Sequence, residues 1–103
     1  MPSAHFALVA WHINGLLAYS VDSSGNLTHV GHDDQGYTAN RVWSDGNFIY
    51  LANNTGGLLT YSIDSSGNLT HIDSDYQGDI AVDVWGDGNF IYLANGTGGL
   101  HTY

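Results

Sequence analysis

The sequence predicts an all-β protein in which one small sheet recurs every 42 residues. Residues 57–71 restate residues 15–29 almost letter for letter, and residues 87–95 restate residues 45–53. Runs of aromatic and β-branched residues recur with the same period, and turns rich in Gly and Asn separate them. No segment shows the apolar period of an amphipathic helix. With a hydrophobic fraction of 43%, the chain can bury a core, so an ordered fold is expected.

Each unit contains four predicted strands. Residues 48–52 are apolar at successive positions, which indicates a strand buried on both faces. A Gly pair follows, and residues 58–63 form the next strand. Residues 64–68 supply the Gly and Asn that a tight hairpin requires, and residues 69–72 form a short third strand. After a polar loop, residues 80–85 form the fourth strand, which is rich in Ala and Val and ends in Trp.

Four short antiparallel strands in about 42 residues are typical of one blade of a β-propeller. We designate the strands A to D from the inside outward and place residues 80–85 at A, where the blade is narrowest. Residues 1–36 then contribute strands B, C and D, residues 37–78 contribute all four, and residues 79–103 contribute A, B and C. A β-helix or an open stack of hairpins is the competing repeat architecture.

An incomplete ring of blades leaves apolar faces uncovered, so we expect the chain to form a homo-oligomer. A dimer with three blades from each chain is favoured. The alternative is a trimer in which residues 80–85 of one chain join strands B to D of the next. Three residues are candidates for assembly. Trp11 has no Trp counterpart in the other copies, and Arg41 occupies the position of Asp83, so that Arg41 is expected beside Asp83 of the neighbouring blade.

The charge balance excludes two classes of partner. Arg41 is the only cation of the chain, against ten acidic side chains, and the formal net charge is −9. Nucleic-acid binding and attraction to anionic membranes both depend on Lys and Arg. An acidic surface instead suits copies of the same chain or a neutral partner such as a carbohydrate.

Two kinds of propeller repeat resemble this sequence. Residues 88–100, with a Gly-Asn turn, an aromatic strand and a Gly-Gly-Leu step, resemble the LVIVD type of repeat. Residues 49–53 followed by residues 59–70 are similar to blades of lactonase-like (phosphogluconolactonase-like) propellers. The resemblance implies a propeller scaffold. It carries over no catalytic residue, and Trp11-His-Ile-Asn14 departs from it at the first loop between strands B and C.

Aromatic and polar residues near the predicted channel mouth are candidates for sugar binding. Trp43 and Trp85 end the two A strands and are most simply packing residues between blades, but they could stack on sugar faces. Loop residues that could join them are Tyr76, Gln77 and Asn95. A lectin-like module is therefore the first alternative to a self-assembling scaffold, and a remnant of a lactonase-like hydrolase is the second.

Catalytic, metal and cofactor sites are not expected. The carboxylates of residues 33–36 and 73–78 match no EF-hand spacing, and turn carboxylates in solvent explain them. His29 and His71 occupy equivalent positions on neighbouring blades, which would hold them apart. The Ser pairs of the hairpins lie beside no triad arrangement. We therefore predict a non-enzymatic protein without a cofactor.

Overall fold

The computed structural model describes residues 5–78 and 80–103, and this part of the chain is all-β. Its strands form three small antiparallel sheets, as the sequence predicts. The first sheet contains β1 (Phe6–Ala10), β2 (Leu16–Val21) and β3 (Leu27–Asp33). The second contains β4 (Arg41–Ser44), β5 (Ile49–Ala52), β6 (Leu58–Ile63) and β7 (Leu69–Asp75). The third contains β8 (Asp83–Gly86), β9 (Ile91–Ala94) and β10 (Leu100–Thr102).

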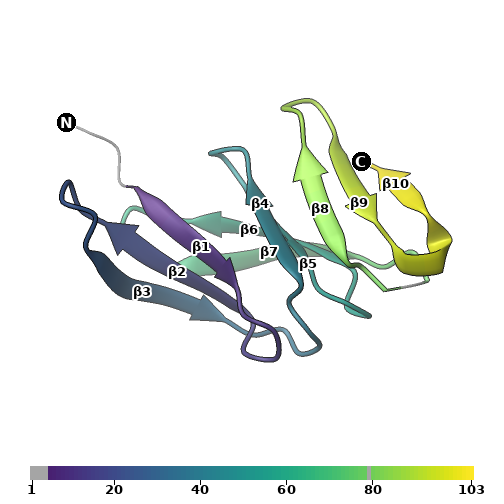
Figure 1. Cartoon of the computed structure of the whole chain (residues 1–103), viewed down its shortest axis with the longest axis horizontal. Coiled ribbons are helices and arrows are strands. Elements are labelled where there is room, and N and C mark those ends of the chain that lie inside the picture. The colour runs from purple at the N-terminus through teal and green to yellow at the C-terminus, as the bar shows by residue number, and fades with distance from the viewer. Residues whose placement is uncertain (1–4, 79) are drawn as a thin grey trace.

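The three sheets follow one another along the longest axis of the molecule, which measures 43 × 29 × 21 Å (Figure 1). Strand order within each sheet follows chain order, so every connection joins neighbouring strands. The N-terminal sheet lies at one end of the stack and the C-terminal sheet at the other. One face of each terminal sheet therefore points away from the rest of the chain.

The hairpin between β6 and β7 is fixed by Asp64. Its Oδ1 atom accepts hydrogen bonds from the backbone N–H groups of Ser66 and Asn68, both at 2.9 Å. Gly67 supplies the positive φ of 91° that the turn needs. The Asn68 side chain and these N–H groups hold the pKa of Asp64 below its usual value. Asp22 makes the same turn between β2 and β3.

A second kind of turn joins the first two strands of the later sheets. Asp45 accepts hydrogen bonds from the N–H groups of Asn47 and Phe48, and the N–H of Phe48 is the largest cause of the lowered pKa of Asp45. Asp87 accepts the equivalent bonds from Asn89 and Phe90. The sequence predicts turns before β5 and before β9. In the structure the carboxylates of Asp45 and Asp87 close these turns.

Strand β7 is longer than the expected residues 69–72, and its pairing with β6 contains an irregularity. The register between β6 and β7 shifts between Thr60 and Tyr61, and the same shift recurs between Ala18 and Tyr19. Beyond the shift, β7 continues to pair through Asp75, so residues 73–75 belong to the strand and not to the loop. Such bulges increase the local twist of a sheet.

Strand β8 begins later than expected, at Asp83 rather than at residue 80. Ala81 pairs with Asn54 of the preceding sheet instead, through N–O distances of 2.9 and 3.1 Å. His12 and Ala39 form the equivalent bridge between the first and second sheets. The residues that connect two sheets are therefore tied to the earlier sheet by main-chain hydrogen bonds.

Two clusters of buried side chains fill the spaces between the sheets. The first joins β2 and the second sheet through Leu16, Ala39, Ile49, Leu51, Leu59 and Tyr61. The second joins the second and third sheets through Ala52, Leu58, Ala81, Val84 and Leu93. No single sheet holds either core by itself. Stacking of one sheet on the next is what buries apolar surface in this chain.

Candidate functional site

The space between the second and third sheets shows how one repeat covers its neighbour. Trp43 stacks on Tyr50 with ring centroids 5.8 Å apart and packs against the second core cluster. Its indole lies directly against Gly86, where an added Cβ would be only 2.5 Å from Cζ3. Leu58 is buried in the same space, with 5% of its surface exposed. Sheet contact therefore covers the Trp and Leu of the second repeat.

The same side chains on the third sheet have no cover from the described residues. Trp85 stacks on Tyr92 at 5.8 Å, as Trp43 stacks on Tyr50, yet 58% of its surface is exposed. Leu100, the equivalent of Leu58, is 69% exposed. Together with Ala94 and Asp83 these residues line a shallow hollow of about 160 Å³. We refer to Trp85, Tyr92, Ala94 and Leu100 as the C-terminal face.

At the opposite end of the stack, the first sheet exposes side chains whose equivalents on the second sheet are more buried. On the second sheet, Leu51 is 1% exposed because the first sheet packs against it. Its equivalent on the first sheet, Val9, is 40% exposed. Leu27 is exposed where its equivalent Leu69 is half-buried, and Tyr19 is more exposed than the fully buried Tyr61. We refer to Val9, Tyr19 and Leu27 as the N-terminal face.

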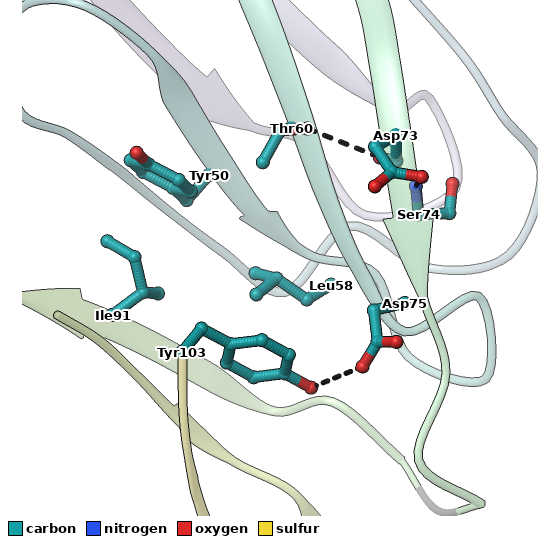
Figure 2. Close-up of a pocket in the computed structure, with 8 residues that line it drawn as sticks. All are labelled: Tyr50, Leu58, Thr60, Asp73, Ser74, Asp75, Ile91 and Tyr103. Atoms are coloured by element: carbon teal, nitrogen blue, oxygen red, sulfur yellow. Dashed lines mark hydrogen bonds between the residues drawn. The ribbon is translucent and has the colours of Figure 1, made fainter.

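A tyrosine and an aspartate connect neighbouring sheets at the outer side of the stack. Figure 2 shows Tyr103 reaching Asp75, with a hydrogen bond of 2.7 Å from its hydroxyl to Oδ2. The two residues line a hollow of about 120 Å³ between the second and third sheets. Burial and the Asp75 carboxylate raise the pKa of Tyr103 to about 12, and hydrogen bonds from Gln77 and Tyr103 lower the pKa of Asp75.

The equivalent residues one repeat earlier are Tyr61 and Asp33, but the Tyr61 hydroxyl is buried without a hydrogen-bond partner among the described residues. Burial raises the pKa of the Tyr61 hydroxyl, and the Asp33 carboxylate adds to the rise. The sequence analysis missed these pairs. The signal was present, because Tyr19, Tyr61 and Tyr103 recur at the repeat interval, as Asp33 and Asp75 do.

Arg41 lies beside Asp83, where the repeat alignment places it. Nε of Arg41 and Oδ1 of Asp83 are 3.9 Å apart, and the two side chains are 68% and 63% exposed. The contact joins the first strands of the second and third sheets. Because both groups remain in solvent, their attraction is weak.

Five residues were candidates for sugar binding: Trp43, Trp85, Tyr76, Gln77 and Asn95. Of these, only Trp85 lines the hollow of the C-terminal face. Tyr76 is exposed in the loop after β7. Gln77 donates a 2.6 Å hydrogen bond to Oδ2 of Asp75. Asn95 is buried, and its Nδ2 atom lies 3.3 Å from Nε2 of His101.

Trp11 is exposed at the N-terminal end of the stack. It lines a hollow of about 220 Å³ with Asn14, Leu17, His29 and His32. His29 also lies against Tyr19, with ring centroids 5.3 Å apart. Over residues 5–78 and 80–103, no group of three or more His, Cys, Asp or Glu side chains could hold a metal ion.

Comparison with known proteins places no restriction on the function. No family model, curated protein or solved structure matches the chain. Among the residues that the structure describes, no helix is long and apolar enough to span a membrane.

Proposed function

We propose that this chain is a non-enzymatic β-propeller building block that assembles with copies of itself into a closed ring. The observation that carries the proposal is the contrast between Leu58 and Leu100. The two residues occupy the same place in consecutive repeats, yet one is 5% and the other 69% exposed. Two things differ around them: a further sheet follows the sheet of Leu58, and β6 pairs with β7 whereas β10 is the edge strand among the described residues. A sheet from a second copy would supply the missing cover.

The first sheet of another copy is the partner with the right chemistry. The surface that covers Trp43 and Leu58 is the near side of the next repeat, which includes Val84 and Leu93. The N-terminal face carries the corresponding position of the repeat, with Val9 equivalent to Leu93. Contact between the C-terminal face of one copy and the N-terminal face of the next is heterologous, so it repeats until a ring closes.

The size of the ring follows from the number of sheets. Three sheets from each chain give about six in a dimer, within the four to eight blades usual for propellers. The alternative is a trimer in which β8 of one chain pairs with β1 of the next. Burying a side chain such as Leu100 contributes about 1.5–3 kcal/mol, so several such residues on each face favour association.

The test is the mass of the assembly. Native mass spectrometry and light scattering at micromolar concentration are expected to show a multiple of 11.1 kDa. Leu100→Asp, which places a carboxylate on the C-terminal face, is expected to give a monomer. Ile72→Asp is the matched control, because Ile72 is an exposed apolar residue on the middle sheet and belongs to neither face. A monomeric protein without any substitution would overturn the proposal.

A carbohydrate-binding module is the second candidate. It is favoured by the exposed stack of Trp85 on Tyr92 beside Asp83, an arrangement of aromatic faces and a hydrogen-bonding group that suits sugars. A glycan array separates the two functions. Binding that Trp85→Ala abolishes while Leu100→Asp leaves it intact would support the sugar site, because only the first change removes the aromatic platform.

A further inference from the structure

Among the described residues, the edge of β1 opposite β2 is unpaired, whereas the equivalent edges of β5 and β9 are paired. In the second sheet β4 pairs with β5, and in the third sheet β8 pairs with β9. Strand β1 is the equivalent of β5 and β9, and among the described residues it pairs with β2 alone. An edge strand with unpaired main-chain groups is a template for a further strand.

A cavity of about 220 Å³ adjoins this edge, between the first and second sheets. Its lining includes Phe6 and Leu8 of β1 and Ser44, Ile49 and Ile63 of the second sheet. Leu8, Ser44 and Ile49 are the repeat equivalents of Tyr50, Gly86 and Ile91. At the next junction Tyr50 stacks on Trp43, and both Trp43 and Ile91 lie close to Gly86 and pack against the same core cluster. The cavity is therefore the place that a side chain equivalent to Trp43 would occupy.

The registers of the β4–β5 and β8–β9 pairs predict which residues of β1 an added strand would face. Arg41, Val42 and Trp43 lie opposite Ala52, Leu51 and Tyr50. Asp83, Val84 and Trp85 lie opposite Ala94, Leu93 and Tyr92. By the same register, three consecutive residues of an added strand would face Ala10, Val9 and Leu8. We call these positions p1, p2 and p3 of the added strand.

The side chain at p3 must be smaller than Trp. Trp43 fits its junction because Gly86 has no side chain, and a Cβ there would lie 2.5 and 2.6 Å from two atoms of the indole. At the open edge the equivalent residue is Ser44, which does have a Cβ. Its hydroxyl is also engaged, donating to the backbone oxygen of Phe48 at 2.9 Å. A Leu or Met at p3 fills the cavity without this overlap.

The side chain at p1 should be acidic. Where two first strands lie side by side, the residue of the later one at this position is Asp83 and that of the earlier one is Arg41. A strand added to β1 would stand in the same relation to β4 as β4 stands to β8. Its p1 residue would then lie beside Arg41, the only cation of the chain.

We propose that the open edge of β1 binds an extended peptide strand with an acidic residue at p1, a β-branched residue at p2 and a Leu- or Met-sized residue at p3. The occupant adds main-chain hydrogen bonds along β1, and its p3 side chain enters the cavity beside Ser44 and Ile49. Copies of β8 match this chemistry at p1 and p2 but carry Trp85 at p3. The edge therefore selects against β8 of a second chain.

The test compares two peptides that differ in one side chain. One has the sequence of residues 80–88, and the other has that sequence with Trp85→Leu. Calorimetric titration into the assembled protein is expected to show the Leu peptide binding at least about tenfold more tightly. Amide shifts at Ala7, Leu8 and Ile49 are expected to locate it. Equal or tighter binding of the Trp peptide would overturn the selectivity and indicate that β8 of another copy occupies the edge.

Two protein variants isolate the cause of the selectivity. Ser44→Gly removes the Cβ, as at the equivalent Gly86, and so makes room for an indole at p3. The preference for the Leu peptide is therefore expected to shrink to less than about threefold. Ser44→Ala is the matched control. It removes the same hydroxyl but keeps the Cβ, and the preference is expected to remain. If Ser44→Gly leaves the preference unchanged, the steric argument is wrong.

The charge preference has its own control. A Leu peptide that also carries Asp83→Lys is expected to bind several-fold more weakly, and Arg41→Ala in the protein is expected to remove that difference. Failure of both original peptides to bind at millimolar concentration would overturn the proposed site. The mass of the protein without peptide is measured in the same samples, so this failure is distinguishable from a failure of the ring.

Discussion

The hydroxyl of Tyr103 donates a 2.7 Å hydrogen bond to Oδ2 of Asp75 and so fastens the last strand of the chain to the sheet before it. The two residues stand 28 positions apart, and each belongs to a different sheet. This pair therefore contributes to holding the third sheet against the second.

The contribution of the Tyr103–Asp75 pair to the stability of the fold is expected to depend on pH. The pKa of Asp75 is lowered in the folded state, so its contribution is present above the ordinary Asp pKa and is lost as the pH falls through the lowered value. The pKa of Tyr103 is raised to about 12, so its contribution is present below the ordinary Tyr pKa and is lost as the pH rises toward 12. Tyr103→Phe is expected to cost about 0.5–1.5 kcal/mol at pH 7. Urea denaturation at pH 7 and at pH 11.5 measures it. The cost should be smaller at pH 11.5, and an equal cost at both values would contradict the assignment.

Gly86 is expected to tolerate no side chain. Its replacement by Ala would place a Cβ 2.5 Å from Cζ3 of Trp43, so Gly86→Ala is expected to cost about 1–3 kcal/mol by overpacking. Thermal and urea denaturation measure the loss. The double variant Trp43→Phe, Gly86→Ala should recover part of it, because the smaller ring leaves room for the methyl group. Independent, additive losses would show that the two residues do not press on each other.

Trp43 and Trp85 are expected to respond differently to the same substitution. Trp43→Ala removes a side chain packed between two sheets of one chain, and it is expected to destabilise the fold by about 3 kcal/mol. Trp85→Ala removes an exposed side chain of the C-terminal face, so it is expected to lower the mass of the assembly while leaving the circular dichroism of the subunit unchanged. Native mass spectrometry with denaturation curves separates the two effects. Equal loss of assembly and stability in both variants would mean that the exposed Trp plays the same role as the packed one.

Arg41 and Asp83 are expected to couple weakly. Both side chains are more than half exposed, and the Nε–Oδ1 distance of 3.9 Å is long for a hydrogen-bonded ion pair. A double-mutant cycle on Arg41→Ala and Asp83→Ala is expected to give about 0–1 kcal/mol, falling further in 0.5 M salt. A larger coupling that survives salt would show that the pair is buried in the assembled protein.

Local chemistry is what the sequence determined about this protein. The repeat of 42 residues, the all-β fold and the places of the hairpin turns can be read from residue order. Strand and turn chemistry depends on residues close together in the chain, although the sequence did not show that Asp side chains close the turns. The ends of the strands were harder to predict from the sequence. The shift between Thr60 and Tyr61 extends β7 to Asp75, and the bridge from Ala81 to Asn54 shortens β8. Both depend on pairing between strands, which no single segment encodes.

The tertiary structure alone decided which copies of a repeated residue are covered. Trp43 and Trp85 each follow a Val, stack on the equivalent residues Tyr50 and Tyr92, and are the third residues of β4 and β8. Sequence analysis therefore assigned both of them to the same packing role. In the folded chain Gly86 lies against Trp43, which packs against the second core cluster, whereas the described residues leave Trp85 exposed. The physical reason is that apolar burial in a stack of sheets comes from the neighbouring repeat, so the environment of each copy depends on its place in the stack.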